Sequence, residues 1–340
     1  MSMTSADKDR QTDDTNFDNP LDKPDDIAEQ VAAATAERES YRRGERIFAG
    51  LSTGSGVLIL AVLAAVAIFL VALAVPTFLA NPDDLPYGEF WSFVLPFAFG
   101  TVWSAFLALL MAVPVSIGIA LFITHYAPRR LAQGLGYIID LLAAVPSVVF
   151  GLWGINVFAP ALVPLYVWLN EHLGWIPFFS GTVSATGRTI FTASMVLAIM
   201  ILPIITALCR EVFLQTPRLH EEASLALGAT RWEMIKQAVL PFGMPGIVSA
   251  SMLGLGRALG ETMAVAMVLS PSSVIGIKLL TAAENPNTIA SNIALSFPEA
   301  FGLGVNQLIA SGLVLFVITL AVNMLARWIV ARRKEFSGAN

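Results

Sequence analysis

Long runs without a single charged residue constrain this chain more than any other feature of its sequence. Leu51 to Ala80 and Phe97 to Thr124 contain no Asp, Glu, Lys or Arg, and about 20 apolar helical residues already cross the hydrocarbon core of a bilayer. Of the 340 residues, 56% are hydrophobic and 13% are charged, whereas a soluble domain carries about 25% charged residues. The sequence therefore predicts an all-α polytopic membrane protein.

Six membrane-spanning helices account for the apolar runs. The third includes Asp140 and is interrupted by Pro146 and Ser147. Ala159 to Leu169 is too short for a further span, so we expect a re-entrant or interfacial segment within 159–190. The six expected spans are Leu51 to Ala80, Phe97 to Thr124, Leu131 to Phe158, Phe191 to Cys209, Gly246 to Ser270 and Phe301 to Ile329.

The segments outside the spans define the domain organisation. Residues 1–50 hold few large apolar side chains, so this tail is expected to be largely disordered, apart from a polar surface helix over 26–46. The first span and an external loop occupy 51–96. The helical core covers 97–330 and contains a long polar loop at 210–245, and 331–340 form a C-terminal tail.

Basic residues fall mostly on one side of this predicted topology. If the six spans alternate, the other side receives only Arg188 and Lys278. Because cytoplasmic loops are enriched in Lys and Arg, the asymmetry predicts that both termini are cytoplasmic. The basic side holds Arg38, Arg42, Arg43, Arg46, Arg129, Arg130, Arg210, Arg218, Arg231, Lys236, Arg327, Arg332, Arg333 and Lys334.

Charged residues inside the predicted spans are candidate site residues. Arg257 and Glu261 fall within the fifth span, and a charge near the bilayer centre costs from about 3 to about 10 kcal/mol or more. The planar guanidinium of Arg257 suits a tetrahedral oxyanion, and Glu261, four residues on, is expected on the same helix face.

We interpret Arg257 and Glu261 as part of a substrate pathway or gate. The alternative is a structural pair that neutralises itself and fixes a subunit interface. Asp140 is a third pathway candidate, unless it is simply hydrated near the end of its span.

The long polar loop carries a helix-turn-helix pattern. Residues 221–227 form a short predicted helix, which Gly228 ends with a left-handed C-cap. Thr230 stands three residues before Glu233, the spacing of a capping box that begins a second helix.

The second predicted helix is amphipathic. Trp232, Ile235 and Val239 recur at helical spacing along one expected face, and Leu240-Pro241 closes the helix. An ordinary amphipathic loop lying on the bilayer would show the same pattern.

The spacing of this loop is similar to the EAA loop of bacterial ABC importer permeases, written EAA-x3-G-x9-I-x-LP. Ser224 replaces the second alanine, and Ala238 stands at the isoleucine position. The resemblance covers the chain from about Phe97 to its end and implies the type I importer permease fold. It also implies that the loop contacts an ATPase subunit through Glu222, Ala223, Ser224, Gly228, Trp232, Leu240 and Pro241.

Two further stretches resemble the phosphate-specific permeases, and the PstC-like subunit more than the PstA-like one. They are Gly254 to Val265, and Pro146 to Trp153. The resemblance implies import of inorganic phosphate across the bacterial plasma membrane, with molybdate or sulfate as alternative oxyanions. The implied partners are a second, PstA-like permease, a PstB-like ATPase dimer that binds ATP and Mg²⁺, and an external PstS-like phosphate-binding protein.

Other functional classes fit the sequence less well. No phosphate-binding loop of the Gly-x-x-x-x-Gly-Lys-[Ser/Thr] type occurs, so the chain is not expected to hydrolyse ATP or to bind a cofactor. No metal-ligand cluster and no nucleophile–base arrangement are present, and nucleic acid is not among the expected partners. An ion-coupled secondary transporter is the remaining rival, although we find no internal repeat of the kind those folds contain.

Overall fold

The computed structural model describes residues 24–269, 272 and 274–334. All regular elements in these ranges are helical, and a single isolated bridge joins Ser272 to Pro286. The predicted all-α class is thereby confirmed. Residues 1–23 of the predicted disordered tail, and the end of the C-terminal tail, lie outside the described residues.

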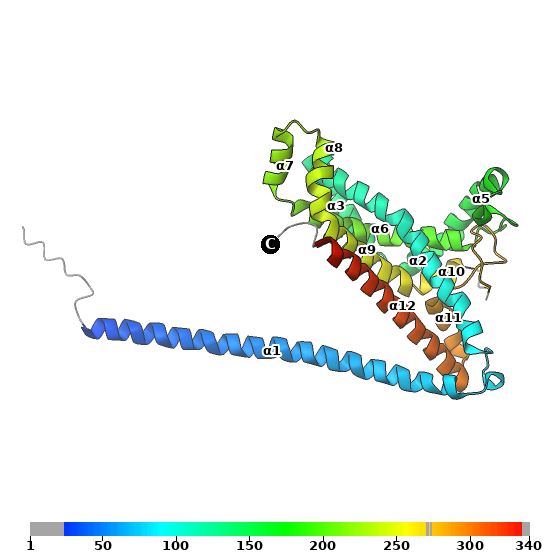
Figure 1. Cartoon of the computed structure of the whole chain (residues 1–340), viewed down its shortest axis with the longest axis horizontal. Coiled ribbons are helices and arrows are strands. Elements are labelled where there is room, and N and C mark those ends of the chain that lie inside the picture. The colour runs from blue at the N-terminus through cyan, green and yellow to red at the C-terminus, as the bar shows by residue number, and fades with distance from the viewer. Residues whose placement is uncertain (1–23, 270–271, 273, 335–340) are drawn as a thin grey trace, which may run out of the picture. The chain divides into compact units, whose positions relative to one another are not determined.

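The elements follow one another as α-helices with short 3-10 and π segments between them, labelled as in Figure 1. The α-helices are α1 Pro24–Leu79, α2 Phe90–Leu121, α3 Arg129–Ala143, α4 Ser147–Trp153, α5 Ala159–Leu173, α6 Ile190–Leu214, α7 Arg218–Ala226, α8 Arg231–Met234, α9 Leu240–Gly260, α10 Met263–Val268, α11 Ile289–Ser296 and α12 Leu303–Lys334. The π segments are η2 Phe122–Tyr126, η3 Gly154–Phe158 and η5 Ile235–Val239, and the 3-10 segments are η1 Pro82–Asp84, η4 Pro177–Phe179 and η6 Phe297–Glu299.

The boundary between two compact units falls inside α1, after Ile68. In the first unit, α1 is a continuous helix from Pro24, so the polar segment predicted as a separate surface helix runs directly into the first span. Over residues 47–68 its large apolar side chains are exposed, with Leu58 at 64% and Leu60 at 69%. Such a surface suits lipid.

The structure confirms six helices that are long and apolar enough to cross a membrane. The first, second, fourth and sixth of these helices overlap the predicted spans. Most of their ends lie within a few residues of the predicted ends. The six candidate spans among the described residues are Ile47–Leu79, Phe90–Tyr126, Ser147–Leu173, Ile190–Leu214, Arg231–Gly260 and Leu303–Trp328.

The predicted third span is wrong. A break at Ala144–Pro146 separates α3 from the following helix, because proline disfavours helical geometry in the residue before it. The span instead covers Ser147–Leu173, so the stretch after Phe158, predicted to be re-entrant or interfacial, belongs to it. Asp140 consequently lies on the separate amphipathic helix α3 and not inside a span.

The predicted fifth span is also shifted. Helix continues from Arg231 through the π segment η5 into α9, so Leu240-Pro241 does not close the second helix of the loop. Proline is tolerated here because it sits in the first turn of α9, directly after the wider π turn. The helix ends at Gly260, whereas the sequence predicted that it continues to Ser270.

The core of the second unit lies where α6 packs between α2 and α9. Leu197, Ile201 and Ile205 of α6 are fully buried. Small side chains allow this close approach, as is common between membrane helices. Ala105 and Ala108 of α2 are both 0% exposed.

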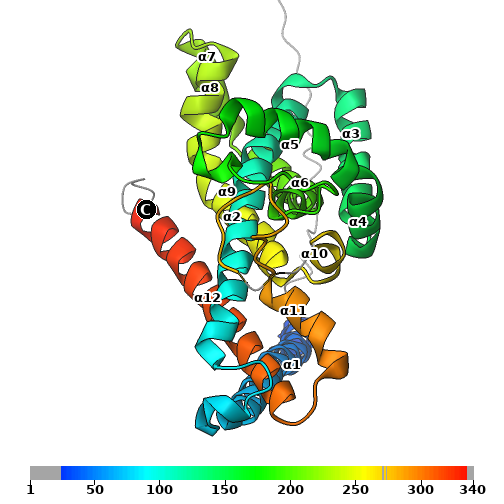
Figure 2. The same ribbon diagram turned by 90° about the vertical axis from the view of Figure 1, so that its right-hand side faces the viewer.

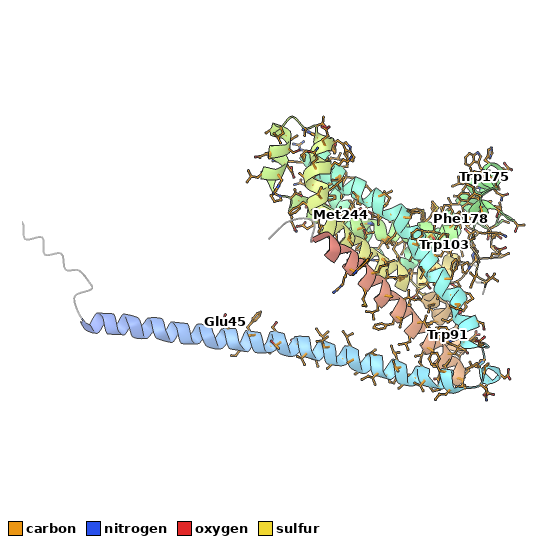
Figure 3. All side chains as sticks on the ribbon, in the orientation of Figure 1. Glu45, Trp91, Trp103, Trp175, Phe178 and Met244 are labelled. Carbon is orange, nitrogen blue, oxygen red and sulfur yellow. The ribbon has the colours of Figure 1, made fainter. Side chains whose placement is uncertain are left out.

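The loop-bearing end and the opposite end of this unit are organised differently. At one end α7 and α8 form a helical hairpin (Figures 1 and 2). Away from the hairpin, Asn285 is fully buried; it accepts a hydrogen bond from the Ile190 amide at 3.0 Å and donates one to the Arg188 carbonyl at 2.9 Å. Trp103 of α2 also stacks on Phe178 there, with ring centroids 5.9 Å apart (Figure 3).

Gly254 provides a test of this packing. A Cβ at Gly254 would lie 2.7 Å from Ile205 Cδ1, whereas a Cβ at Gly118 of α2 would meet nothing within 4 Å. We expect Gly254→Val to lower the free energy of unfolding by about 1–3 kcal/mol through overpacking, and Gly118→Val to have a much smaller effect. Thermal unfolding of the two purified variants measures this, and equal midpoints would contradict the packing described here.

Candidate functional site

The hairpin at the loop-bearing end has the geometry predicted from the sequence. Gly228 has φ +88°, the left-handed conformation that glycine adopts without strain. The Thr230 hydroxyl accepts a hydrogen bond from the Glu233 amide at 3.3 Å, and the Glu233 carboxylate accepts one from the Thr230 amide at 2.8 Å. Both the predicted C-cap and the predicted capping box are therefore confirmed.

The hairpin exposes large apolar side chains. Leu219 is 78% exposed, Leu227 is 90% exposed and Trp232 is 57% exposed. Exposure of this apolar surface to water is energetically unfavourable. Exposed apolar patches mark sites of protein contact. The two leucines were not among the residues predicted to bind a partner, although Leu227 lies within the short helix predicted at 221–227.

The prediction that Trp232, Ile235 and Val239 share one face of the second helix is wrong for Trp232. Ile235 and Val239 are fully buried, whereas Trp232 points away from the core and is exposed. The π segment that begins at Ile235 changes the residues per turn, so the predicted periodicity does not hold across it.

A groove runs between the two arms of the hairpin. It has a volume of about 480 Å³. Three of the residues predicted to contact an ATPase line it, namely Ala223, Ser224 and Gly228. Glu222 is exposed beside it, and Pro241 is exposed at the start of α9. The structure thus brings the predicted loop residues to one projecting end, apart from the half-buried Leu240.

Arg257 lies in the last turn of α9 and lines an open crevice of about 530 Å³. The crevice combines the guanidinium with the polar side chains of Ser249 and Asn323, the latter from α12. No described residue forms an ion pair or hydrogen bond with Arg257. Its donors therefore remain available within this chain. Asn323 was not predicted as a site residue, because only the tertiary structure brings α12 beside α9.

The predicted pairing of Arg257 with Glu261 is wrong. The helix ends at Gly260, and Glu261 adopts extended φ/ψ of −68° and 124°. Its carboxylate, only 8% exposed, accepts a hydrogen bond from the Ala264 amide at 3.0 Å. A carboxylate is favourable there because the N-terminus of a helix carries partial positive charge. Glu261 therefore caps α10 instead of neutralising Arg257.

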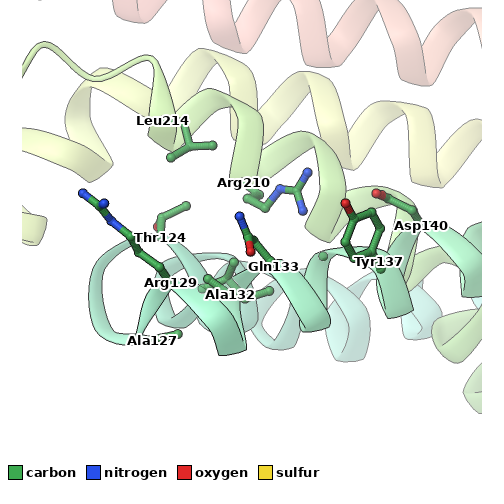
Figure 4. A pocket seen from close by; sticks show the side chains of 11 residues that line it. Thr124, Ala127, Arg129, Ala132, Gln133, Tyr137, Asp140, Arg210 and Leu214 are labelled. Carbon is green, nitrogen blue, oxygen red and sulfur yellow. The ribbon is translucent and has the colours of Figure 1, made fainter.

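Asp140 is exposed and lies on α3, apart from Arg257 and Glu261. It lines a different pocket, together with Arg210 of α6 (Figure 4). The sequence did not single out Arg210 beyond its positive charge. The structure therefore does not bring the three predicted charged residues into one site.

A contact between a histidine and a glutamate links the hairpin to the end of the second span. His125 Nε2 lies 3.6 Å from Glu221 Oε1, and His125 Nδ1 lies 2.6 Å from Thr124 Oγ1. This contact between η2 and α7 joins residues far apart in the sequence, so no local pattern predicted it. It fixes one arm of the hairpin against the core.

Comparison with known proteins agrees with this architecture. The model of the family described as binding-protein-dependent transport system inner membrane component matches residues 116–335. A bacterial ABC transporter that imports alginate contains a chain with TM-score 0.55 and 17% identity, covering 81% of this chain and 95% of that one. At this identity the likeness supports the fold alone.

Two curated relatives illustrate the sequence similarity. The phosphate transport system permease protein PstC 2 of Mycobacterium tuberculosis is 46% identical over 325 residues, covering 91% of this chain and 96% of that protein. The phosphate transport system permease protein PstC of Mesorhizobium japonicum is 36% identical over 330 residues, covering 92% and 99%. The chain therefore belongs to the binding-protein-dependent transport system inner membrane components, the membrane subunits of ABC importers. Its predicted resemblance to the PstC permeases is confirmed.

Separate roles for Arg257 and Glu261 lead to a testable expectation. Because no ion pair joins them, the effects of Arg257→Gln and Glu261→Gln on unfolding free energy should add within about 0.5 kcal/mol. A thermal or denaturant double-mutant cycle on the purified protein measures this coupling. A coupling clearly larger than that would restore the predicted structural pair.

Proposed function

We propose that this chain is the transmembrane permease subunit of an ATP-driven importer that moves inorganic phosphate into the cytoplasm. The observation that carries the proposal is the projecting hairpin, which has the EAA spacing, the left-handed Gly228 and exposed apolar side chains. The PstC relatives support phosphate as the substrate, over molybdate or sulfate. The chain is not an ATPase, and a separate subunit binds ATP and Mg²⁺.

The proposed assembly contains four kinds of subunit. A PstA-like permease pairs with this chain, a PstB-like ATPase dimer contacts the hairpin, and a PstS-like protein delivers phosphate from outside. Leu219, Leu227 and Trp232 would be covered by the ATPase, since their exposed apolar surface is favourable only when a partner removes it from water.

The proposed orientation of the chain across the membrane follows from its basic residues. With the observed spans, Arg129 and Arg130 of α3 lie between the second and third spans, on the same side of the membrane as Arg218 of the hairpin. The positive-inside bias then places the hairpin and both termini in the cytoplasm of a bacterium, within its plasma membrane.

Arg257 is the proposed contact for the passing anion. Its unpaired guanidinium lines the crevice between α9 and α12 with Ser249 and Asn323, a set of donors that suits an oxyanion. Glu261 supports this site indirectly, because it caps the helix that follows the break after Gly260. Asp140 takes no part in this crevice, so we no longer place it in the pathway.

Replacement of Arg257 tests the pathway role. Arg257→Gln should reduce phosphate uptake at least about tenfold, because a hydrogen bond to a charged group is lost in transit, while recovery of the assembled complex stays near normal. Arg130→Gln, which removes an exposed arginine of α3, serves as the control and should transport normally. Full uptake by Arg257→Gln would remove Arg257 from the pathway.

Gly228 tests the hairpin as the ATPase contact. A Cβ at Gly228 would meet nothing within 4 Å, so Gly228→Val acts through backbone strain, which costs about 1–2 kcal/mol in the left-handed region. We expect Gly228→Val to weaken co-purification of the ATPase, and Gly228→Asn, which tolerates this conformation better, to retain more of it. Equal recovery of the ATPase with both variants would argue against the proposed docking geometry.

A further inference from the structure

A second polar pocket lies at the end of the core unit that carries the hairpin. It has a volume of about 480 Å³ and is formed between α3, η2 and the end of α6. Figure 4 shows the side chains that line it. The polar ones are Thr124, Arg129, Gln133, Tyr137, Asp140 and Arg210.

The α3 wall of the pocket is one stripe of the helix. Arg129, Gln133, Gly136 and Asp140 follow one another at intervals of four, three and four residues, so they share a face. The opposite side of α3 is apolar, with Ile138 54% exposed. The polar stripe therefore faces the pocket, whereas the apolar side is available to lipid or to another subunit.

Arg210 is the central cation of this pocket. Its Nε atom is buried and has no hydrogen-bond partner. No salt bridge joins it to Asp140 or to any other described residue, although Asp140 lines the same pocket. The residue as a whole is half-buried and lines the pocket, while its Nε atom is shielded from water. A guanidinium shielded in this way is stabilised by an acceptor placed in the pocket, and an anion is the strongest such acceptor.

Gly136 makes room for this guanidinium. A Cβ at Gly136 would overlap Arg210 Nη1, so the arginine lies directly against the backbone of α3. Gly134, two residues earlier, would meet nothing within 4 Å. The missing side chain at Gly136 therefore leaves the space in which Arg210 lies against the pocket wall. Gly134 has no such neighbour.

The charge of the pocket favours an anion. Arg129 and Arg210 contribute two positive charges, and Asp140 contributes one negative charge. In Figure 4 Asp140 lies beyond Tyr137, at the opposite end of the pocket from Arg129, with Arg210 and Gln133 between them. An oxyanion between the two arginines would also receive a hydrogen bond from the amide group of Gln133.

We propose that this pocket binds a phosphate-type oxyanion, supplied either as free inorganic phosphate or as the headgroup of an anionic phospholipid. The occupied site would lie beside the hairpin, because Thr124 of the pocket wall contacts His125, which pairs with Glu221 of α7. The inference does not rest on phosphate transport. It concerns a site on different helices from the Arg257 crevice.

The experiment places an environment-sensitive fluorophore beside the pocket. Arg130→Cys provides the label, since Arg130 is exposed and does not line the pocket, and the native Cys209 is buried. The assembled transporter is placed in phosphatidylcholine nanodiscs, without ATP or binding protein. One arm titrates inorganic phosphate against chloride at equal ionic strength, and the other replaces part of the lipid with phosphatidylglycerol.

We expect a saturable fluorescence change in the phosphate arm if the ligand is free phosphate, or in the phosphatidylglycerol arm if it is a headgroup. Arg210→Gln and Gly136→Ala should each weaken the apparent affinity at least about tenfold, and Arg210→Lys should weaken it less. The matched controls Gly134→Ala and Arg218→Gln should leave it unchanged. A saturable response in neither arm, or one that Arg210→Gln and Gly136→Ala do not alter, would overturn the proposal.

Discussion

The burial of α6 between α2 and α9 is the contact on which the rest of the core depends. Lipid offers no hydrophobic driving force for joining apolar helices, so they associate through close packing of small and branched side chains. Ala105 and Ala108 of α2 and Gly254 of α9 supply the small surfaces, and Ile201 and Ile205 of α6 fill them. This arrangement fixes α9, which carries Arg257 and continues from α8, the second arm of the hairpin, through η5.

One helix joins the hairpin to the crevice. It runs from Arg231 through η5 to Gly260, and at 1.5 Å per residue Arg257 lies about 39 Å along it from Arg231. Trp232 of the proposed ATPase contact and the proposed anion contact therefore belong to one continuous helix. The helix ends after Gly260, where Glu261 caps the next helix, so Arg257 lies beside a break and not in the middle of a uniform span.

The charged residues of the core fall into two groups. Arg257 lines a crevice with uncharged donors, and Arg210 lines a pocket at the hairpin end with Arg129 and Asp140. The two sites share no residue. The Arg257 crevice fits an anion in transit between α9 and α12. The Arg210 pocket fits an anion held beside the hairpin. The His125–Glu221 pair connects the second site to the hairpin.

The sequence by itself determined the helical class, the number of spans, the left-handed Gly228 and the capping box of Thr230 and Glu233. These features follow from local composition and spacing: apolar length, a glycine at a C-cap, and a hydroxyl three residues before a carboxylate. Only the tertiary structure decided that Glu261 leaves Arg257 unpaired, that Asp140 shares a pocket with Arg210, and that Asn323 joins Arg257. Helical spacing places two residues on one face only while the helix continues, and contacts between distant helices depend on packing that no local pattern encodes.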